Sequence, residues 1–221
     1  MRKRRVAVLI SGRGSNLMAL AQAARQGSYP AEIALVLSNR PQAAGLVLAQ
    51  QSGLATAVVD HARFGADRRG FETAIQAVLE QTRVEIVCLA GFMRLLTPSF
   101  VMQWSGRMLN IHPSLLPAFK GLDTHARALA AGVKIHGATA HFVAEEMDSG
   151  PIIAQGALAV RENDTAEALA TRVLTLEHHI YPLALALVAS DRAKLSHGRC
   201  IIAGTHSDES VLIAPNMQSQ K

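Results

Sequence analysis

The sequence contains few cysteines and few aromatic residues. Only Cys88 and Cys200 are present, and Phe, Trp and Tyr together make up 4% of the 221 residues. Two cysteines supply neither a disulfide framework nor a four-cysteine metal site, so we expect a reducing compartment, the cytoplasm. Nucleic-acid readers usually need stacking aromatics or a dense basic face, whereas the basic residues behind the net charge of +5 are scattered. We therefore expect small phosphorylated or carboxylated ligands and no nucleic acid.

Long apolar runs and the common metal and hydrolase motifs are absent as well. No stretch approaches the roughly 20 apolar residues of a membrane span, and the run 6–10 after the basic residues 2–5 is too short for a signal peptide. The patterns His-Glu-x-x-His, paired Cys-x-x-Cys and Gly-x-Ser-x-Gly do not occur. The sequence thus predicts no membrane insertion, no metal and no serine nucleophile.

Short apolar runs alternate with longer amphipathic runs in the first half of the chain. Strands are expected at 6–10, 33–37, 56–59, 86–90 and 108–111, and helices near 16–26, 43–52, 67–82 and 97–104. Runs that are apolar on both faces and joined by helices indicate a doubly wound, mostly parallel α/β sheet of Rossmann-like type. In such sheets ligands bind outside the carboxyl ends of the strands, which are followed here by 11–16, 91–96 and 112–122.

The second half of the chain predicts a different arrangement. After a helix near 123–131, the strand-like runs 136–144 and 151–160 flank a turn, which favours an antiparallel pair in the carboxyl-terminal half. A long helix is expected from about 165 to 189, capped by Asp164 or Thr165. No linker divides the chain, so we predict one domain over residues 1–204 and a loosely ordered tail over 205–221.

The loop from Ser11 to Asn16, Ser-Gly-Arg-Gly-Ser-Asn, lies between the first expected strand and its helix. Backbone N–H groups and the helix dipole favour an anion there, and the Ser15 hydroxyl and Asn16 amide add hydrogen bonds. Leu17 occupies the third-glycine position of the dinucleotide pattern, and no Gly-Lys-Ser/Thr ending follows, so neither a nicotinamide cofactor nor ATP is predicted. A phosphate site and a plain turn capped by Ser15 are equally compatible with this loop.

Asn110, His112 and Asp148 form a candidate catalytic set. In a strand, Asn110 and His112 share one face, while Leu109 and Ile111 face the core. An acyl carbon attacked by an amine passes through an oxyanion, to which Asn110 and a protonated His112 would donate. Asp148, if near, would orient the ring and favour its charged form.

Simpler explanations exist for each of these residues, and an isolated histidine such as His112 is more often a surface or core residue than a catalyst. Asp148 is also typical of a turn in Asp-Ser-Gly-Pro, and Asn110 of a strand end. Five of the other histidines have no neighbouring motif that suggests a site: His61, His178, His179, His197 and His206. A role at the site stays undecided for three more: His125, His136 and His141.

Several short motifs follow one another in a specific order. They are Ile10 to Leu17, Leu89 to Leu96, Asn110 to Pro117 with Gly121, His136-Gly137, and Asp148 to Pro151. With these motifs the chain, from Val6 to about Ala189, resembles the glycinamide ribonucleotide formyltransferase family, folate-dependent enzymes of purine synthesis. The resemblance implies direct transfer of the formyl group of 10-formyltetrahydrofolate to the glycyl amine of the ribonucleotide, without a covalent enzyme intermediate.

The resemblance also implies roles for individual residues. Asn110, His112 and Asp148 match the family's catalytic Asn, His and Asp. The ribonucleotide would be held at its phosphate by Gly14, Ser15 and Asn16, and at its glycinamide and ribose by Leu174, Thr175, Leu176 and Glu177. The folate would lie along Met93, Arg94, Leu95 and Leu96, beside Asn110, and along Ala144, Glu145, Glu146, Met147 and Asp148, with Arg68 or its neighbour Arg69 at the glutamate.

Some positions depart from the family's pattern, and two related enzymes compete as interpretations. Asp123 stands where His is expected, residues 118–120 are unusual, and Leu174 is apolar, but no proposed catalytic group is lost. Formyltetrahydrofolate hydrolase adds an amino-terminal regulatory domain to this core, and methionyl-tRNA formyltransferase adds a carboxyl-terminal barrel. A chain of 221 residues is therefore expected to be neither of these enzymes. The intact catalytic set disfavours a non-catalytic binding module. The sequence leaves monomer and homodimer open.

Overall fold

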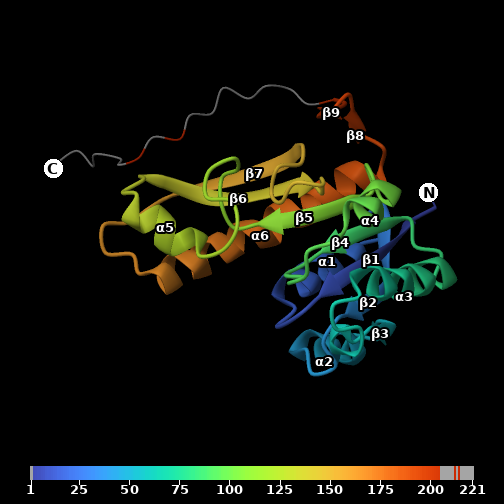
Figure 1. The fold of residues 1–221 in the computed structure, drawn as a ribbon. Helices are drawn as coiled ribbons and strands as arrows, with labels where there is room; N and C mark the ends of the chain where they lie inside the picture. Colours follow the sequence, from blue (N-terminus) through green and yellow to red (C-terminus); the bar gives the residue numbers. More distant parts are fainter. Residues whose placement is uncertain (1, 205–211, 213, 215–221) are drawn as a thin grey trace, which may run out of the picture.

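The computed structural model describes residues 2–204, 212 and 214, which build a seven-stranded sheet covered by helices (Figure 1). The strands follow the order β3-β2-β1-β4-β5-β6-β7 across the sheet. They are β1 (Arg4–Ile10), β2 (Ala31–Ser38), β3 (Thr56–Val58), β4 (Ile86–Leu89), β5 (Met108–His112), β6 (Ile135–Phe142) and β7 (Ile152–Ala159). The first five pair in parallel, whereas β6 is antiparallel to both β5 and β7. The predicted doubly wound sheet and its antiparallel pair are confirmed.

Two apolar layers separate the sheet from its helices. The helices are α1 (Ser15–Ala24), α2 (Ala44–Gln51), α3 (Arg68–Gln81), α4 (Pro98–Gln103), α5 (Thr124–Ala130) and α6 (Ala166–Ala189). Alternate residues of β1 point to opposite layers: Val8 packs in the layer with α1, α2 and α6, and Leu9 in the layer with α3 and α4. Burial on both faces explains why these strands are continuous apolar runs.

The helix ends agree with the sequence to within two residues. Asp67, Thr97 and Thr165 are the N-cap residues of α3, α4 and α6. The side chain of each accepts a hydrogen bond from a backbone N–H of the first turn. These oxygens satisfy donors that have no partner within the helix. Local capping chemistry therefore fixes where these three helices start.

A small hairpin after α6 was not predicted. It consists of β8 (Ala193–Ser196) and β9 (Arg199–Ile202), joined by His197 and Gly198, which both have positive φ. Two such residues match the tight turn that suits the twist of a hairpin. The strands contain only four residues each, so the local sequence signal for this hairpin is weak.

The predicted boundary at residue 204 stays a prediction. The hairpin ends just before it, but residues 205–211, 213 and 215–221 of the proposed tail lie outside the described residues. Within the described part of the chain, no helix is both long and apolar enough to cross a bilayer.

Candidate active site

The carboxyl ends of β1, β4 and β5 lie together at one edge of the sheet, because these strands are parallel neighbours. The loops 11–14, 90–97 and 113–123 leave the sheet at this edge. The Met93 backbone N–H donates to the buried Ser11 hydroxyl at 2.8 Å, which ties the first two loops to each other. The sequence-predicted site residues lie on these loops, on β5, on α1, α3 and α6, and on the β6–β7 connection.

The loop after β1 presents an open helix end. Gly14 precedes α1 in the left-handed region, with φ 81°, and no side chain caps the helix. A Cβ on Gly14 would lie 2.8 Å from the Cα of Gly45, so the backbone approach requires glycine. Without a side-chain cap, the first backbone N–H groups of α1 are available to an anion. The predicted phosphate role of Gly14, Ser15 and Asn16 agrees with this geometry and stays a prediction.

The side chain of Asn16 contacts α6. Its Nδ2 donates to Oε2 of Glu177 at 2.6 Å, and both side chains are buried. Burial raises the pKa of the Glu177 carboxyl, against the hydrogen bond from Asn16, which lowers it. Asn16 Oδ1 is buried and has no hydrogen-bond partner among the described residues. The structure thus brings together two predicted ribonucleotide residues that are 161 positions apart, and Glu177 is a buried carboxyl and not an exposed helix charge.

The rest of the predicted glycinamide and ribose segment lies within α6, one turn before Glu177. Leu174 and Leu176 are half-buried, and Thr175 is exposed with its hydroxyl bonded to the Thr171 carbonyl. No feature of the described residues assigns these three a ligand, so their role stays a prediction.

Asn110, His112 and Asp148 converge. The first two lie on β5, on the face opposite Leu109 and Ile111, which are buried in the core as expected. The β6–β7 connection folds back over β5 and brings Asp148 Oδ2 to 3.4 Å from His112 Nδ1. The side chains of His112 and Asp148 are 7% and 9% exposed, so the pair is largely shielded from solvent.

Both nitrogens of the His112 ring face acceptors. Nε2 lies 3.0 Å from the Phe119 carbonyl and Nδ1 faces the Asp148 carboxylate. Because an imidazolium donates from both nitrogens, this environment suits the charged ring. Asp148 Oδ2 also accepts the Gly121 backbone N–H at 2.9 Å, which holds the 113–123 loop over the site. The carboxylate is therefore bonded to the loop and adjacent to the imidazole.

His141 is a further residue of this site, which sequence reasoning left undecided. Its Nε2 lies 3.2 Å from Asn110 Nδ2 and 4.0 Å from Asp148 Oδ1. The side chain is 3% exposed and comes from β6, where His141 pairs directly with Asn110. The pairing between β5 and β6 is the signal that identifies it, and no local pattern around His141 contains that information.

The predicted folate loop is fastened to α3 at two points. An Arg68 guanidinium N–H donates to the Leu95 carbonyl at 2.6 Å. One turn along α3, the buried Glu72 accepts the Thr97 backbone N–H at 2.6 Å and the Thr97 hydroxyl. No hydrogen bond of Arg69 reaches this loop among the described residues, and the role of Arg68 or Arg69 at the folate stays a prediction.

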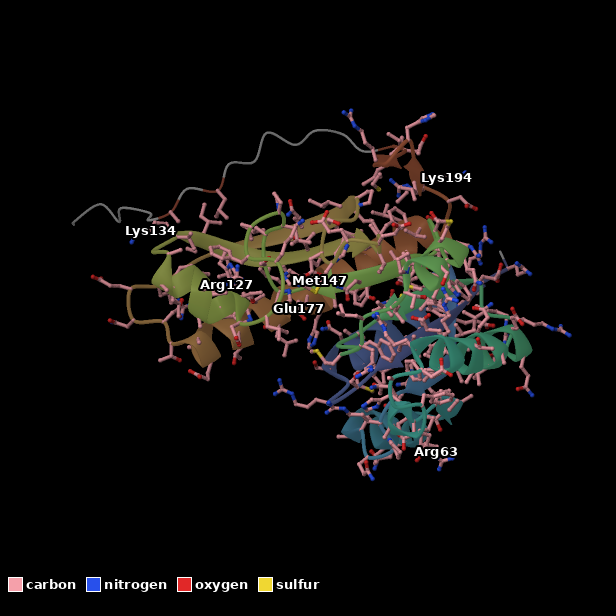
Figure 2. All side chains as sticks on the ribbon, viewed as in Figure 1. Arg63, Arg127, Lys134, Met147, Glu177 and Lys194 are labelled. Carbon is pink, nitrogen blue, oxygen red and sulfur yellow. The ribbon has the colours of Figure 1, made fainter. Side chains whose placement is uncertain are left out.

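Exposed apolar side chains lie on the loops and the connection that form the site. Met93, Leu95, Leu122 and Met147 are each more than half exposed, and Figure 2 labels Met147 near the middle of the molecule. Arg94 and Leu96 are half-buried, as is Ala144, whereas Glu145 and Glu146 are exposed. Exposed apolar side chains gathered on such loops are typical of an interaction site. No group of three or more His, Cys, Asp or Glu among the described residues is arranged to hold a metal ion.

The histidines His125 and His136 form a pair next to His112. His136 Nε2 is 3.3 Å from His125 Nδ1, and the Phe119 ring meets His136 edge-on at 5.9 Å. Burial, together with the neighbouring His125, lowers the pKa of His136 to about 4. The 113–123 loop therefore packs against a buried and neutral imidazole.

The sequence matches the family described as "Formyl transferase" over residues 4–185. A phosphoribosylglycinamide formyltransferase from Escherichia coli strain K12 is 40% identical over 199 residues, which cover 90% of this chain and 93% of that relative. The trifunctional purine biosynthetic protein adenosine-3 of Bos taurus is 52% identical over 194 residues, 88% of this chain. The chain spans only 19% of the length of that trifunctional relative.

Solved structures give the same grouping. The phosphoribosylglycinamide formyltransferase of Coxiella burnetii superimposes with a TM-score of 0.87 at 43% identity, covering 92% of this chain and 95% of that one. A formyltetrahydrofolate deformylase from Pseudomonas syringae superimposes with a TM-score of 0.83 at 26% identity, covering 91% of this chain and 66% of that one.

Proposed function

The chain belongs to the formyl transferase family, and on this premise we propose that it transfers the formyl group of 10-formyltetrahydrofolate to the glycyl amine of glycinamide ribonucleotide. The products are formylglycinamide ribonucleotide and tetrahydrofolate, a step of purine biosynthesis. The observation that carries the proposal is the convergence of Asn110, His112 and Asp148 at the sheet edge that also bears an uncapped helix end. This arrangement offers acyl-transfer groups beside a phosphate site.

The chemistry follows from the positions of these groups. The glycyl amine attacks the formyl carbon, and a tetrahedral species forms with its negative charge on the former carbonyl oxygen. Asn110 Nδ2 donates a hydrogen bond to that oxygen, and the charged His112 stabilises it electrostatically. The amine nitrogen loses a proton, N10 of the folate gains one, and the C–N10 bond breaks, so no net proton is consumed.

Asp148 supports the charged form of His112. Its carboxylate faces Nδ1 of the ring while the Phe119 carbonyl faces Nε2. In this arrangement His112 acts through its charge, and proton donation from Nε2 to a substrate requires the Phe119 carbonyl to move aside. The fold therefore links proton transfer by His112 to the position of the 113–123 loop.

The substrates occupy the two sides of this centre. The ribonucleotide phosphate binds the α1 end at Gly14, Ser15 and Asn16, and Glu177 with the preceding turn of α6 binds the ribose and glycinamide. The folate pterin binds the backbone of 93–96 and 144–148, and Arg68 meets its glutamate. The co-substrate is 10-formyltetrahydrofolate, and no metal takes part.

The remaining proposals concern the protein as a whole. We propose a cytoplasmic enzyme with one formyltransferase domain over residues 1–204, without nucleic-acid or membrane partners. The Escherichia coli relative is matched over 93% of its length, which supports a domain that works by itself, and the trifunctional relatives carry a matching segment within a much longer chain. Monomer and homodimer remain equal alternatives.

The competing function is hydrolysis of 10-formyltetrahydrofolate, favoured by the structural likeness to a deformylase. In that reaction water replaces the amine, so the phosphate-binding helix end would have no use. The lower identity to the deformylase, 26% against 43% for the Coxiella formyltransferase, supports transfer.

An assay with both substrates tests the proposal. The protein is mixed with 10-formyltetrahydrofolate and glycinamide ribonucleotide, and the formylated nucleotide is detected by mass. We expect product with both substrates and little folate breakdown when the nucleotide is omitted. His112→Asn should abolish transfer, and His197→Asn, in the exposed β8–β9 turn, serves as the matched control. Equal folate breakdown with and without nucleotide would establish the hydrolase instead.

A further inference from the structure

His141 faces Asn110 across the antiparallel pair of β5 and β6. The two residues are direct register partners, so their side chains leave the sheet on the same face. The β6–β7 pairing is irregular at this point, with a register shift between Ala140 and His141. Such irregularities often redirect a side chain next to a functional site. Here the His141 ring is buried against the Asn110 carboxamide.

The hydrogen bonds of His141 define its tautomer. Nδ1 lies 2.7 Å from the Phe142 carbonyl, which can only accept, so Nδ1 carries the proton. In a neutral ring, Nε2 is then a bare acceptor. Burial lowers the pKa of His141, which agrees with a neutral ring. The partner of Nε2, the Asn110 side chain, must therefore donate.

This acceptor fixes the orientation of the Asn110 carboxamide. The amide of an asparagine can be turned by 180° with little change in shape, and only its partners decide which end donates. Because His141 Nε2 accepts, Nδ2 of Asn110 points toward β6 and uses one N–H there. Its second N–H remains for another acceptor.

We propose that His141 is a positioning residue that makes Asn110 a hydrogen-bond donor to the reacting formyl oxygen. The inference rests on the proposed formyl transfer, in which the oxyanion needs that donor. Without the bare Nε2, the carboxamide is free to turn its own oxygen toward the developing negative charge, which would raise the barrier. His141 does not contact the substrate and acts only through Asn110.

The other neighbours of His141 do not explain its ring. Asp148 Oδ1 is 4.0 Å from Nε2, beyond hydrogen-bond distance, so His141 is not a relay between the carboxylate and solvent. The Phe142 carbonyl binds Nδ1 and leaves Nε2 to Asn110 alone. A purely structural role would be satisfied by any side chain that fills this volume.

Variants at both positions separate positioning from stability. His141→Leu removes the acceptor, and His141→Gln keeps an amide oxygen that can accept from Asn110. We expect His141→Leu to lower kcat about 10- to 100-fold with nearly unchanged KM for both substrates, a part of the loss expected when an oxyanion donor is removed. His141→Gln should recover most of that kcat. Tyr29→Phe, which loses one hydrogen bond to the Pro182 carbonyl away from the site, is the control.

A double-mutant cycle adds the decisive comparison. In an Asn110→Ala background, His141→Leu should lower kcat no further, because the group it positions is already gone. An equal loss in both backgrounds, or a wild-type kcat for His141→Leu, would overturn the proposal. Failure of the wild-type protein to formylate the nucleotide would instead refute the proposed function.

A measurement on the unmodified protein keeps the proposal testable if the leucine variant does not fold. The ring ¹⁵N shifts of His141, measured by NMR near neutral pH, should be those of a neutral ring protonated at Nδ1. A charged ring, or a proton on Nε2, would contradict the orientation of Asn110 derived from this contact.

Discussion

Acid should destabilise the protein through His136. This side chain is 1% exposed, lies against His125 and Phe119, and has its pKa lowered by burial from 6.5 to about 4. In the unfolded chain the same imidazole keeps its ordinary pKa, so between pH 6.5 and pH 4 the unfolded state binds more protons. The contribution of His136 to the free energy of unfolding is therefore fully present above this window. It is lost as the pH falls through the window.

The size of the effect follows from the two pKa values. Between pH 7 and pH 5, linkage with a pKa of 6.5 unfolded and about 4 folded removes at most about 2 kcal/mol for this one group. The pKa of His125 is lowered too, also mainly by burial, so the wild-type protein should lose somewhat more than His136 alone accounts for. The excess is a property of the coupled pair.

Urea unfolding at the two pH values measures this loss. The single tryptophan, Trp104, is buried and reports the transition by fluorescence. His136→Gln removes the titrating group, so its free energy of unfolding should fall by about 2 kcal/mol less than that of the wild type between pH 7 and pH 5. Tyr29→Phe, which changes no histidine, should keep the wild-type dependence. An identical fall for wild type and His136→Gln would refute the reasoning.

Three further substitutions test other parts of the site. Asp148→Asn removes the charge that faces His112 Nδ1, so kcat should drop by about 10³-fold or more with little change in the nucleotide KM; near-normal turnover would exclude Asp148 from the mechanism. Ser15→Ala should chiefly raise the nucleotide KM, because Ser15 begins the uncapped α1, and an unchanged KM would leave it only a structural role. Glu72→Gln removes the charged acceptor of the Thr97 N–H and hydroxyl, so the protein should lose about 1–3 kcal/mol of stability and the folate KM should rise; wild-type values of both would show that α3 does not hold this loop.

The elements of the fold were predictable because their signals are local. From Val6 to Ile10, β1 is buried on both faces and therefore continuously apolar, and the Thr165 cap marks the start of α6. The hairpin after α6 was missed because its strands are short and its turn uses His197 where asparagine or aspartate is the usual signal.

The candidate site was predictable only in part. Asn110 and His112 share a strand face, which a period of two residues reveals. Asp148 was proposed as the partner of His112 only on the condition of proximity, and the His141 partner of Asn110 could not be read from the sequence. Asn16 is bonded to Glu177, an arrangement that depends on how α1 packs against α6, and Arg68 is distinguished from Arg69 only by its bond to Leu95.

The sequence by itself determined the alternation of strands and helices, the edge of the sheet at which the candidate site lies, and the residue types available for acyl transfer. Only the tertiary structure decided which of nine histidines joins Asn110 and which carboxylate faces His112. The physical reason is that burial and capping act between residues close in the chain, whereas strand register and the path of the β6–β7 connection set contacts between residues far apart. His141 and Asp148 owe their places to those long-range contacts.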